Sequence, residues 1–179
     1  MMFENLTSDI RRYTKESQGL FDKANFYILF EQGLWAIVIY RFGRWVRTIR
    51  IPIVVYVLKI IAFILFKFAE IATGISLPAS VQIGKGFYIG HFSNIILHRD
   101  VNMGENCSIG PGVLIGTRGL GRKGAPIIGN NVYIGAGAKI LGKITIGNNV
   151  RIGANSVVLT DVPDGVTAVG IPAKIVRKT

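Results

Sequence analysis

The sequence predicts a mainly β protein, a parallel β-solenoid, preceded by an apolar α-helical segment. The first observation is a six-residue period within residues 127–158, which is neither helical nor a simple strand alternation. The aliphatic positions of this period are Ile128, Ile134, Ile140, Ile146, Ile152 and Val158. The second observation is that glycine follows four of them, and that Asn-Asn pairs follow two of those glycines, so residues that tolerate positive φ recur at the bends. Such units bury their apolar faces only by stacking on one another.

A second inward-facing set supports the same fold. Two residues before the aliphatic positions stand mostly small or β-branched residues, namely Val132, Ala138, Ile144, Val150 and Ser156. Both sets face inward if each hexapeptide forms one side of a triangular coil. The same period occurs earlier, at Leu77, Ile83, Ile89 and Ile95, then slips by two residues and resumes at Met103, Ile109 and Ile115. We therefore expect a solenoid domain over residues 74–179, with a small bulge between Ile95 and Met103.

Residues 116–126 interrupt the period. This segment, GTRGLGRKGAP, contains four glycines and three basic residues, Arg118, Arg122 and Lys123. No βαβ pattern surrounds the glycines, so a dinucleotide-binding motif is excluded. We expect an extruded, basic loop, and we expect the proline and charges of residues 159–179 to cap the far end of the solenoid.

Residues 1–73 are expected to form the helical segment. Residues 26–47 are apolar, with aromatic and basic residues gathered at the end, and Pro52 begins a second apolar helix. Lys59, Lys67 and Glu70 break the apolar run of that helix before it reaches the roughly 20 residues needed to span a bilayer. The pattern favours a helix lying in the headgroup region of an anionic membrane. Packing against a partner subunit and true spanning are the alternatives.

Composition limits the cellular setting and the partners. The formal net charge is +11, with ten Lys/Arg against six Asp/Glu in residues 1–75 and eleven against four in residues 76–179, so both parts favour anions. Nucleic acid is a poor explanation, because the basic residues are scattered and no recognised binding fold accompanies them. The single cysteine, Cys107, falls on the inward-facing set and is expected to fill the core, which suits a reducing compartment. The N-terminus is too polar for a signal peptide, so we expect a cytoplasmic protein, peripheral at the inner face of the membrane.

At this point a family resemblance is visible. The run IGAGAKILGKITIGNNVRIGANSVV and the following DVPDGVTAVGIPAKIV resemble the hexapeptide-repeat acyltransferases, which fold as a left-handed parallel β-helix. The segment GISLPASVQIGKGFYIGHFSNIILHRDV resembles their serine acetyltransferase branch, and especially its cousins that O-acetylate sugars of exopolysaccharide, capsule or O-antigen. The N-terminal YRFGRWVR with its Pro-started helix also resembles those polysaccharide-pathway members. The left-handed coil is implied by the resemblance alone.

The resemblance implies direct transfer of an acetyl group from acetyl-CoA, with His91 as general base and no permanently bound cofactor. An imidazole titrates near neutral pH and can accept a hydroxyl proton during attack on a thioester. The alternative is that His91 is an ordinary surface residue at a strand corner. His98 and Asp100 are candidates for orienting the base or the substrate, although a solvated turn explains them equally. Ser76 and Asn94 complete this set.

The chain departs from the serine branch at three places. Serine acetyltransferases have an aspartate where Gly90 stands, a carboxylate where Ser76 stands, and a histidine in the extruded loop that is missing here. Those groups would hold the ammonium and carboxylate of serine, so the sequence favours a glycosyl hydroxyl as acceptor. By resemblance, the backbone of Gly116, Ala136 and Ala154 lines the pantetheine path between two solenoids of a homotrimer. The candidates for the CoA phosphates are Lys139, Arg151 and Lys174.

The sequence thus predicts a homotrimeric, acetyl-CoA-dependent O-acetyltransferase that modifies a sugar of a surface polysaccharide. The alternative enzyme is serine O-acetyltransferase, and the alternative outside enzymes is a non-catalytic β-helix scaffold. A metal protein resembling the γ-carbonic anhydrases requires three histidines at one site, whereas the chain has two histidines in total. No metal site is therefore predicted.

Overall fold

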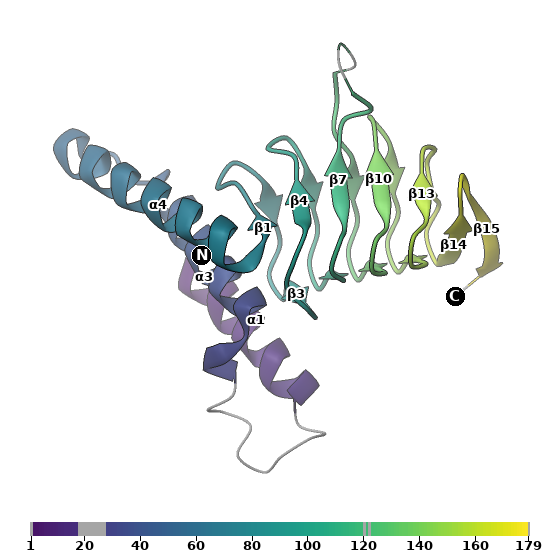
Figure 1. The fold of residues 1–179 in the computed structure, drawn as a ribbon, viewed down its shortest axis with the longest axis horizontal. Coiled ribbons are helices and arrows are strands. Elements are labelled where there is room, and N and C mark those ends of the chain that lie inside the picture. The colour runs from purple at the N-terminus through teal and green to yellow at the C-terminus, as the bar shows by residue number, and fades with distance from the viewer. Residues whose placement is uncertain (1, 18–27, 120, 122, 179) are drawn as a thin grey trace.

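The computed structural model describes residues 2–17, 28–119, 121 and 123–178. Helices form the N-terminal part and a three-sided coil of short strands forms the rest, as Figure 1 shows, so the predicted fold class is confirmed. The helical elements are α1 (Met2–Ser17), the 3₁₀ helix η1 (Ile28–Phe30), α3 (Gln32–Val46) and α4 (Pro52–Thr73).

Three sheets form the sides of the coil, and their strands are parallel except for β15, which is antiparallel to β14. Sheet A contains β1 (Ile75–Ser76), β4 (Ile95–Leu97), β7 (Leu114–Gly116), β10 (Lys139–Leu141) and β13 (Val157–Val158). Sheet B contains β2 (Gln82–Ile83), β5 (Asn102–Met103), β8 (Ile127–Ile128) and β11 (Thr145–Ile146). Sheet C contains β3 (Tyr88–Ile89), β6 (Ser108–Ile109), β9 (Tyr133–Ile134), β12 (Arg151–Ile152), β14 (Val166–Gly170) and β15 (Ala173–Lys178).

Both inward-facing sets predicted from the sequence are buried along the axis of the coil. Residues that tolerate positive φ stand at the corners. Among them are Asn106, Asn131, Asn149 and Asn155, with φ values of 55–56°. Asparagine side chains also link successive corners, since Asn131 Nδ2 donates to Asn149 Oδ1 at 3.1 Å. Stacking therefore buries the apolar residues of each coil and provides hydrogen-bond partners for its polar turns.

The two-residue slip in the period lies elsewhere than the sequence predicted. Strand register aligns Leu97, and not Ile95, with Ile115, while Ile75 aligns with Ile95. The extra residues therefore lie between β3 and β4, in the turn 90–94. A period counted on single aliphatic positions misplaces the slip, because β4 buries two residues, Ile95 and Leu97, and the count took Ile95 in place of Leu97.

The N-terminal helices cap the first open end of the coil through side-chain bonds to its backbone. The Tyr13 hydroxyl accepts from the Ile89 amide at 3.1 Å and donates to the Ile89 carbonyl at 3.0 Å. Tyr40 donates to the Val81 carbonyl at 2.9 Å. An uncovered terminal coil exposes unpaired amides and carbonyls, so these contacts close an edge that is otherwise open to aggregation.

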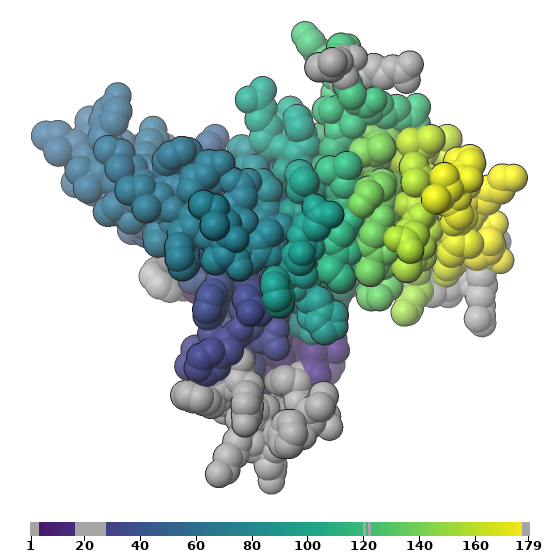
Figure 2. Space-filling model, viewed as in Figure 1, coloured from purple at the N-terminus to yellow at the C-terminus, as the bar shows by residue number. Residues whose placement is uncertain are grey.

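Helix α4 is the second apolar helix that the sequence predicts to begin at Pro52. It runs unbroken for 22 residues from Pro52 to Thr73 and ends at Gly74 with φ 65°. It packs on α3 and projects away from the coil, as Figure 2 shows. Within the described residues, α4 is the one helix long and apolar enough to cross a membrane by length and composition.

Candidate active site

A cavity of about 690 Å³ lies on the outer face of sheet C, at the corner that leads into sheet A. The exposed residue His91 lines it together with Tyr88 of β3 and with Pro111 from the next corner along the coil. Helix α1 supplies two further lining residues, Arg12 and Glu16. The site thus combines an accessible imidazole with charged groups from a segment about 80 residues away in the chain.

The turn that carries His91 is the irregular corner of the coil. Residues 90–94 separate the buried Ile89 and Ile95, and two of them adopt positive φ, Ser93 at 92° and Asn94 at 52°. Backbone bonds hold the turn on both sides: the Ser93 amide donates to the Thr73 carbonyl, and the Gly112 amide donates to the Ser93 carbonyl, each at 3.0 Å. The two added residues therefore form a fixed turn that places His91 beside the cavity.

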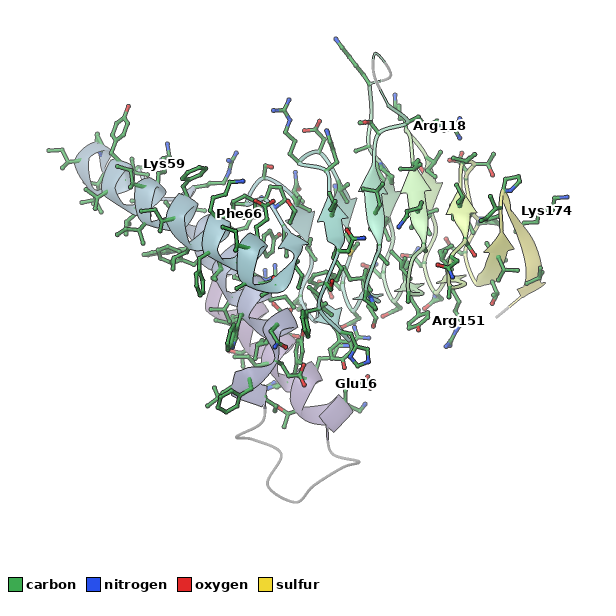
Figure 3. The ribbon with its side chains drawn as sticks, in the orientation of Figure 1. Glu16, Lys59, Phe66, Arg118, Arg151 and Lys174 are labelled. Atoms are coloured by element: carbon green, nitrogen blue, oxygen red, sulfur yellow. The ribbon has the colours of Figure 1, made fainter. Side chains whose placement is uncertain are left out.

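Arg12 crosses from α1 to the first two coils. Its guanidinium donates to the Gly86 carbonyl at 2.7 Å and to Ser108 Oγ at 2.6 Å, and lies 5.9 Å from the centre of the Tyr88 ring. Glu16 follows one helical turn later and is exposed; Figure 3 shows it at the same lower edge of the molecule as Arg151. Among the described residues that line the cavity, Glu16 is the one carboxylate.

Sequence reasoning missed Arg12 and Glu16, because it treated residues 1–73 only as a helical segment. A signal was present in the spacing of the residues that contact the coil. Asp9, Arg12, Tyr13 and Glu16 recur at i, i+3, i+4 and i+7, the pattern of one helix face. Because that face is mostly charged, the sequence did not indicate that it packs against the coil.

Three of the predicted CoA-binding residues lie together. Arg151, on β12, and Ala136 line the cavity, and the Arg151 guanidinium lies 5.4 Å from the centre of the Tyr133 ring. Ala154 lies one coil further along the same corner, because the Asn155 amide donates to the Ala136 carbonyl at 2.8 Å. These positions form a continuous path along the corner between sheets C and A.

The other predicted phosphate ligands lie apart from this path. Lys139 is on sheet A, where its ammonium donates to the Gly112 carbonyl. Lys174 is exposed on β15, and Figure 3 shows it at the far end of the coil, away from Arg151. The three cations therefore do not converge within one chain.

The extruded loop lies at the opposite edge of sheet A from His91. His91 precedes β4, whereas the loop follows β7, so the strands of sheet A separate the two corners; Figure 3 shows Arg118 at the upper edge and Glu16 at the lower. Arg118, Lys123 and Lys143 line a second cavity of about 620 Å³ there. Gly116 ends β7 at this same edge. Arg122 lies outside the described residues.

Three of the four remaining candidates for orienting His91 lie away from it or make other contacts. Asp100 pairs with His98, with 3.7 Å between Oδ2 and Nδ1, and both follow β4 at the loop side of sheet A. Ser76, in the first coil, hydrogen-bonds the Glu70 carboxylate, and Lys67 and Ser76 together hold the pKa of Glu70 below its usual range. Asn94 shares the turn of His91, as its position in the sequence requires.

Cys107 is fully buried, and its thiol donates to the Gly129 carbonyl at 3.2 Å. Burial raises the pKa of this thiol to about 11, which keeps it protonated and unreactive near neutral pH. Among the described residues, no three His, Cys, Asp or Glu side chains are grouped to hold a metal ion. The cavity itself is lined by the imidazole of His91 and by the charged side chains of Arg12, Glu16 and Arg151.

Comparison with known proteins identifies the family. A model of the bacterial transferase hexapeptide (six repeats) matches residues 125–160. The serine acetyltransferase of Synechococcus elongatus is 34% identical over 179 residues, covering 99% of this chain and 70% of the relative. That of Helicobacter pylori strain J99 is 35% identical over 175 residues, covering 97% and 98% of the two chains. The chain belongs to the serine acetyltransferase family.

Solved structures of this family share the fold over nearly the whole chain. Serine acetyltransferase from Brucella abortus strain S19 in complex with coenzyme A superposes with a TM-score of 0.83 at 29% identity, covering 99% of this chain and 68% of that one. The Neisseria gonorrhoeae enzyme in complex with serine superposes with a TM-score of 0.80 at 31% identity, covering 97% and 68%. The protein is thus an acetyl-CoA-dependent acyltransferase with a left-handed β-helix, which excludes the scaffold alternative.

The predicted sugar acceptor and role in surface polysaccharide synthesis are wrong. The relatives are serine acetyltransferases, and the similarity extends through residues 1–73, which the sequence analysis linked to polysaccharide enzymes. The error arose because the prediction considered only residues of the coil, where Gly90 and Ser76 stand in place of carboxylates. The structure brings charged groups to the cavity from α1, outside the repeats.

Proposed function

We propose that this chain is a serine O-acetyltransferase that transfers the acetyl group of acetyl-CoA to the serine hydroxyl, with His91 as general base. The observation that carries the proposal is the cavity in which His91, Arg12 and Glu16 meet, in a chain similar over its length to serine acetyltransferases. An amino-acid acceptor carries a hydroxyl, an ammonium and a carboxylate. The cavity offers a base, an anion and cations for these three groups.

The imidazole acts in two steps. In its neutral form, His91 accepts the hydroxyl proton as the serine oxygen attacks the thioester carbonyl, and a carbon–oxygen bond forms. When the tetrahedral intermediate collapses, the carbon–sulfur bond breaks and the imidazolium returns its proton to the sulfur of CoA. No covalent enzyme intermediate is required, so the buried Cys107 has no part in the reaction.

The charged residues of α1 supply acceptor recognition. Glu16 pairs with the serine ammonium and takes the place of the carboxylate that Gly90 lacks. The Arg12 guanidinium has five N–H donors, and its bonds to Gly86 and Ser108 leave others to bind the serine carboxylate. Recognition then depends on the docking of α1 against the coil, which Tyr13 and Asp9 hold in place.

CoA binds between copies of the chain in a homotrimer. Sheet A separates His91 from Arg118 and Lys123 within one chain, so a neighbouring copy must supply these two cations if they are to bind the phosphates of CoA bound near His91. Ala136 and Ala154 of the first copy then lie along the pantetheine arm, opposite Gly116 of the neighbour. Lys139 and Lys174 are left outside this arrangement.

The test is CoA release from acetyl-CoA with serine, compared with a monosaccharide as acceptor. We expect turnover with serine and a loss of 10²- to 10⁴-fold in His91→Ala, the usual contribution of a general base. The control is Lys85→Ala, which removes an exposed residue paired with Glu105 at 3.8 Å, outside the cavity. Unchanged turnover in His91→Ala contradicts the base, and release with the sugar alone contradicts the acceptor.

A further inference from the structure

Helix α4 has an apolar face that no described part of the chain covers. Residues on the side facing α3 are partly or fully buried, among them Leu58, Ala62 and Ala69. The opposite side presents a stripe at steps of three and four residues, with exposures of 55–86%. The residues of this stripe are Ile53, Val57, Ile60, Ile64, Phe68 and Ile71. A face of this kind in water marks an interaction surface.

The charged residues of α4 lie along one edge of the helix. Lys59, Lys67 and Glu70 recur at steps of eight and three, between the packed side and the exposed stripe. Lys67 and Glu70 form an ion pair at 2.6 Å, and Lys59 lies 5.9 Å from the centre of the Tyr56 ring. A helix that spans a bilayer carries these charges into the hydrocarbon, whereas a helix lying in the surface lets them reach the headgroups.

The surroundings of the stripe are cationic. Residues 32–69 contain six Lys/Arg and no Asp or Glu. Arg41 is buried against Asp9, but Arg47 and Arg50, which precede α4, are exposed, and Trp45 is 36% exposed beside them. Basic residues with tryptophan at the border of an apolar face match the anionic headgroups of a lipid surface.

We propose that α4 lies in the surface of an anionic bilayer, with its Ile53–Ile71 stripe among the acyl chains and its basic edge at the headgroups. At 1.5 Å per residue the helix is about 33 Å long, so the stripe offers an extended contact. Figure 1 shows α4 projecting from the first coil, away from the later coils. This inference does not depend on the identity of the acceptor.

The experiment is co-sedimentation of the full chain with vesicles of phosphatidylcholine containing 30% phosphatidylglycerol, against vesicles of phosphatidylcholine alone. We expect at least tenfold more bound protein on the anionic vesicles and a clear loss of binding at high salt. The double variant Ile60→Glu/Ile64→Glu should lose binding, since it places two charges in the stripe. Ile175→Glu, which changes an exposed isoleucine on β15, is the matched control and should bind normally.

Three outcomes overturn the proposal. Equal binding of the double variant, with a circular dichroism spectrum and melting temperature like those of the parent chain, shows that α4 is not the contact. Resistance of the bound protein to extraction by alkaline carbonate indicates a spanning helix. Absence of vesicle binding, together with a larger assembly by analytical ultracentrifugation that the double variant abolishes, assigns the stripe to contacts between copies of the chain.

Discussion

Arg41 of α3 and Asp9 of α1 form an ion pair, with 2.8 Å between Nε and Oδ2, in which the side chains are 3% and 0% exposed. Arg41 also donates to the carbonyls of Ile83 and Gly84, and Asp9 accepts from the Phe87 amide at 2.8 Å. Two helices are thereby joined to the first coil at one point. The pair fixes the position from which α1 reaches the cavity.

Replacing Arg41 by leucine should therefore destabilise the whole N-terminal cap. It leaves the Asp9 carboxylate buried without its partner, a change that costs about 3–5 kcal/mol in free energy of unfolding. Urea denaturation measures this loss. The exposed pair of Lys67 and Glu70 provides the control, since Lys67→Ala should cost less than about 1 kcal/mol. An Arg41→Leu protein as stable as the parent would show that this ion pair does not hold the N-terminal helices to the coil.

Glu16→Gln should weaken serine binding selectively. It keeps the shape of the side chain and removes the charge, so we expect the KM for serine to rise about 10- to 100-fold, the equivalent of one charge-assisted hydrogen bond. The KM for acetyl-CoA should stay the same. Glu4→Gln changes an exposed carboxylate in the first turn of the same helix and is the matched control. A rise in the KM for acetyl-CoA alone would place Glu16 in the donor site instead.

Complementation between two inactive variants should reveal a site shared by two copies. His91→Ala removes the base, and Arg118→Ala/Lys123→Ala removes loop cations at the other edge of sheet A. Neither protein alone should be efficient at low acetyl-CoA. When the two are co-expressed, some sites combine an intact His91 with an intact loop, so activity should exceed the sum of the separate proteins. Activity no greater than that sum argues that each chain binds CoA by itself.

Cys107 should react with thiol reagents only after unfolding. Burial favours its protonated form and raises its pKa to about 11, above the usual value of about 8.5 in an unfolded chain. The resulting stabilisation is fully present below the unfolded pKa and is lost as pH rises from about 8.5 to about 11. Labelling with a disulfide reagent at pH 8, with and without urea, checks the accessibility. Rapid labelling of the native protein would contradict the buried assignment.

The repeats carried enough local information to predict the coil. Each hexapeptide places its apolar residues and turn formers in the same way, so the parallel coil and its two inward-facing sets could be predicted from the order of residues. His91 was singled out by the resemblance of its surrounding sequence to the acyltransferase family, and not by the repeat pattern itself. The role of His91 as base stays a prediction.

Only the tertiary structure decided how distant segments meet. The contacts of Arg12 with Gly86 and Ser108 join residues 74 and 96 positions apart, and no local pattern encodes their register. The same packing placed the two extra residues at the turn of His91 and put the basic loop across sheet A from it. A repeat determines its own fold through short-range sterics and burial, whereas a site assembled from a helix and a coil depends on how their surfaces fit together.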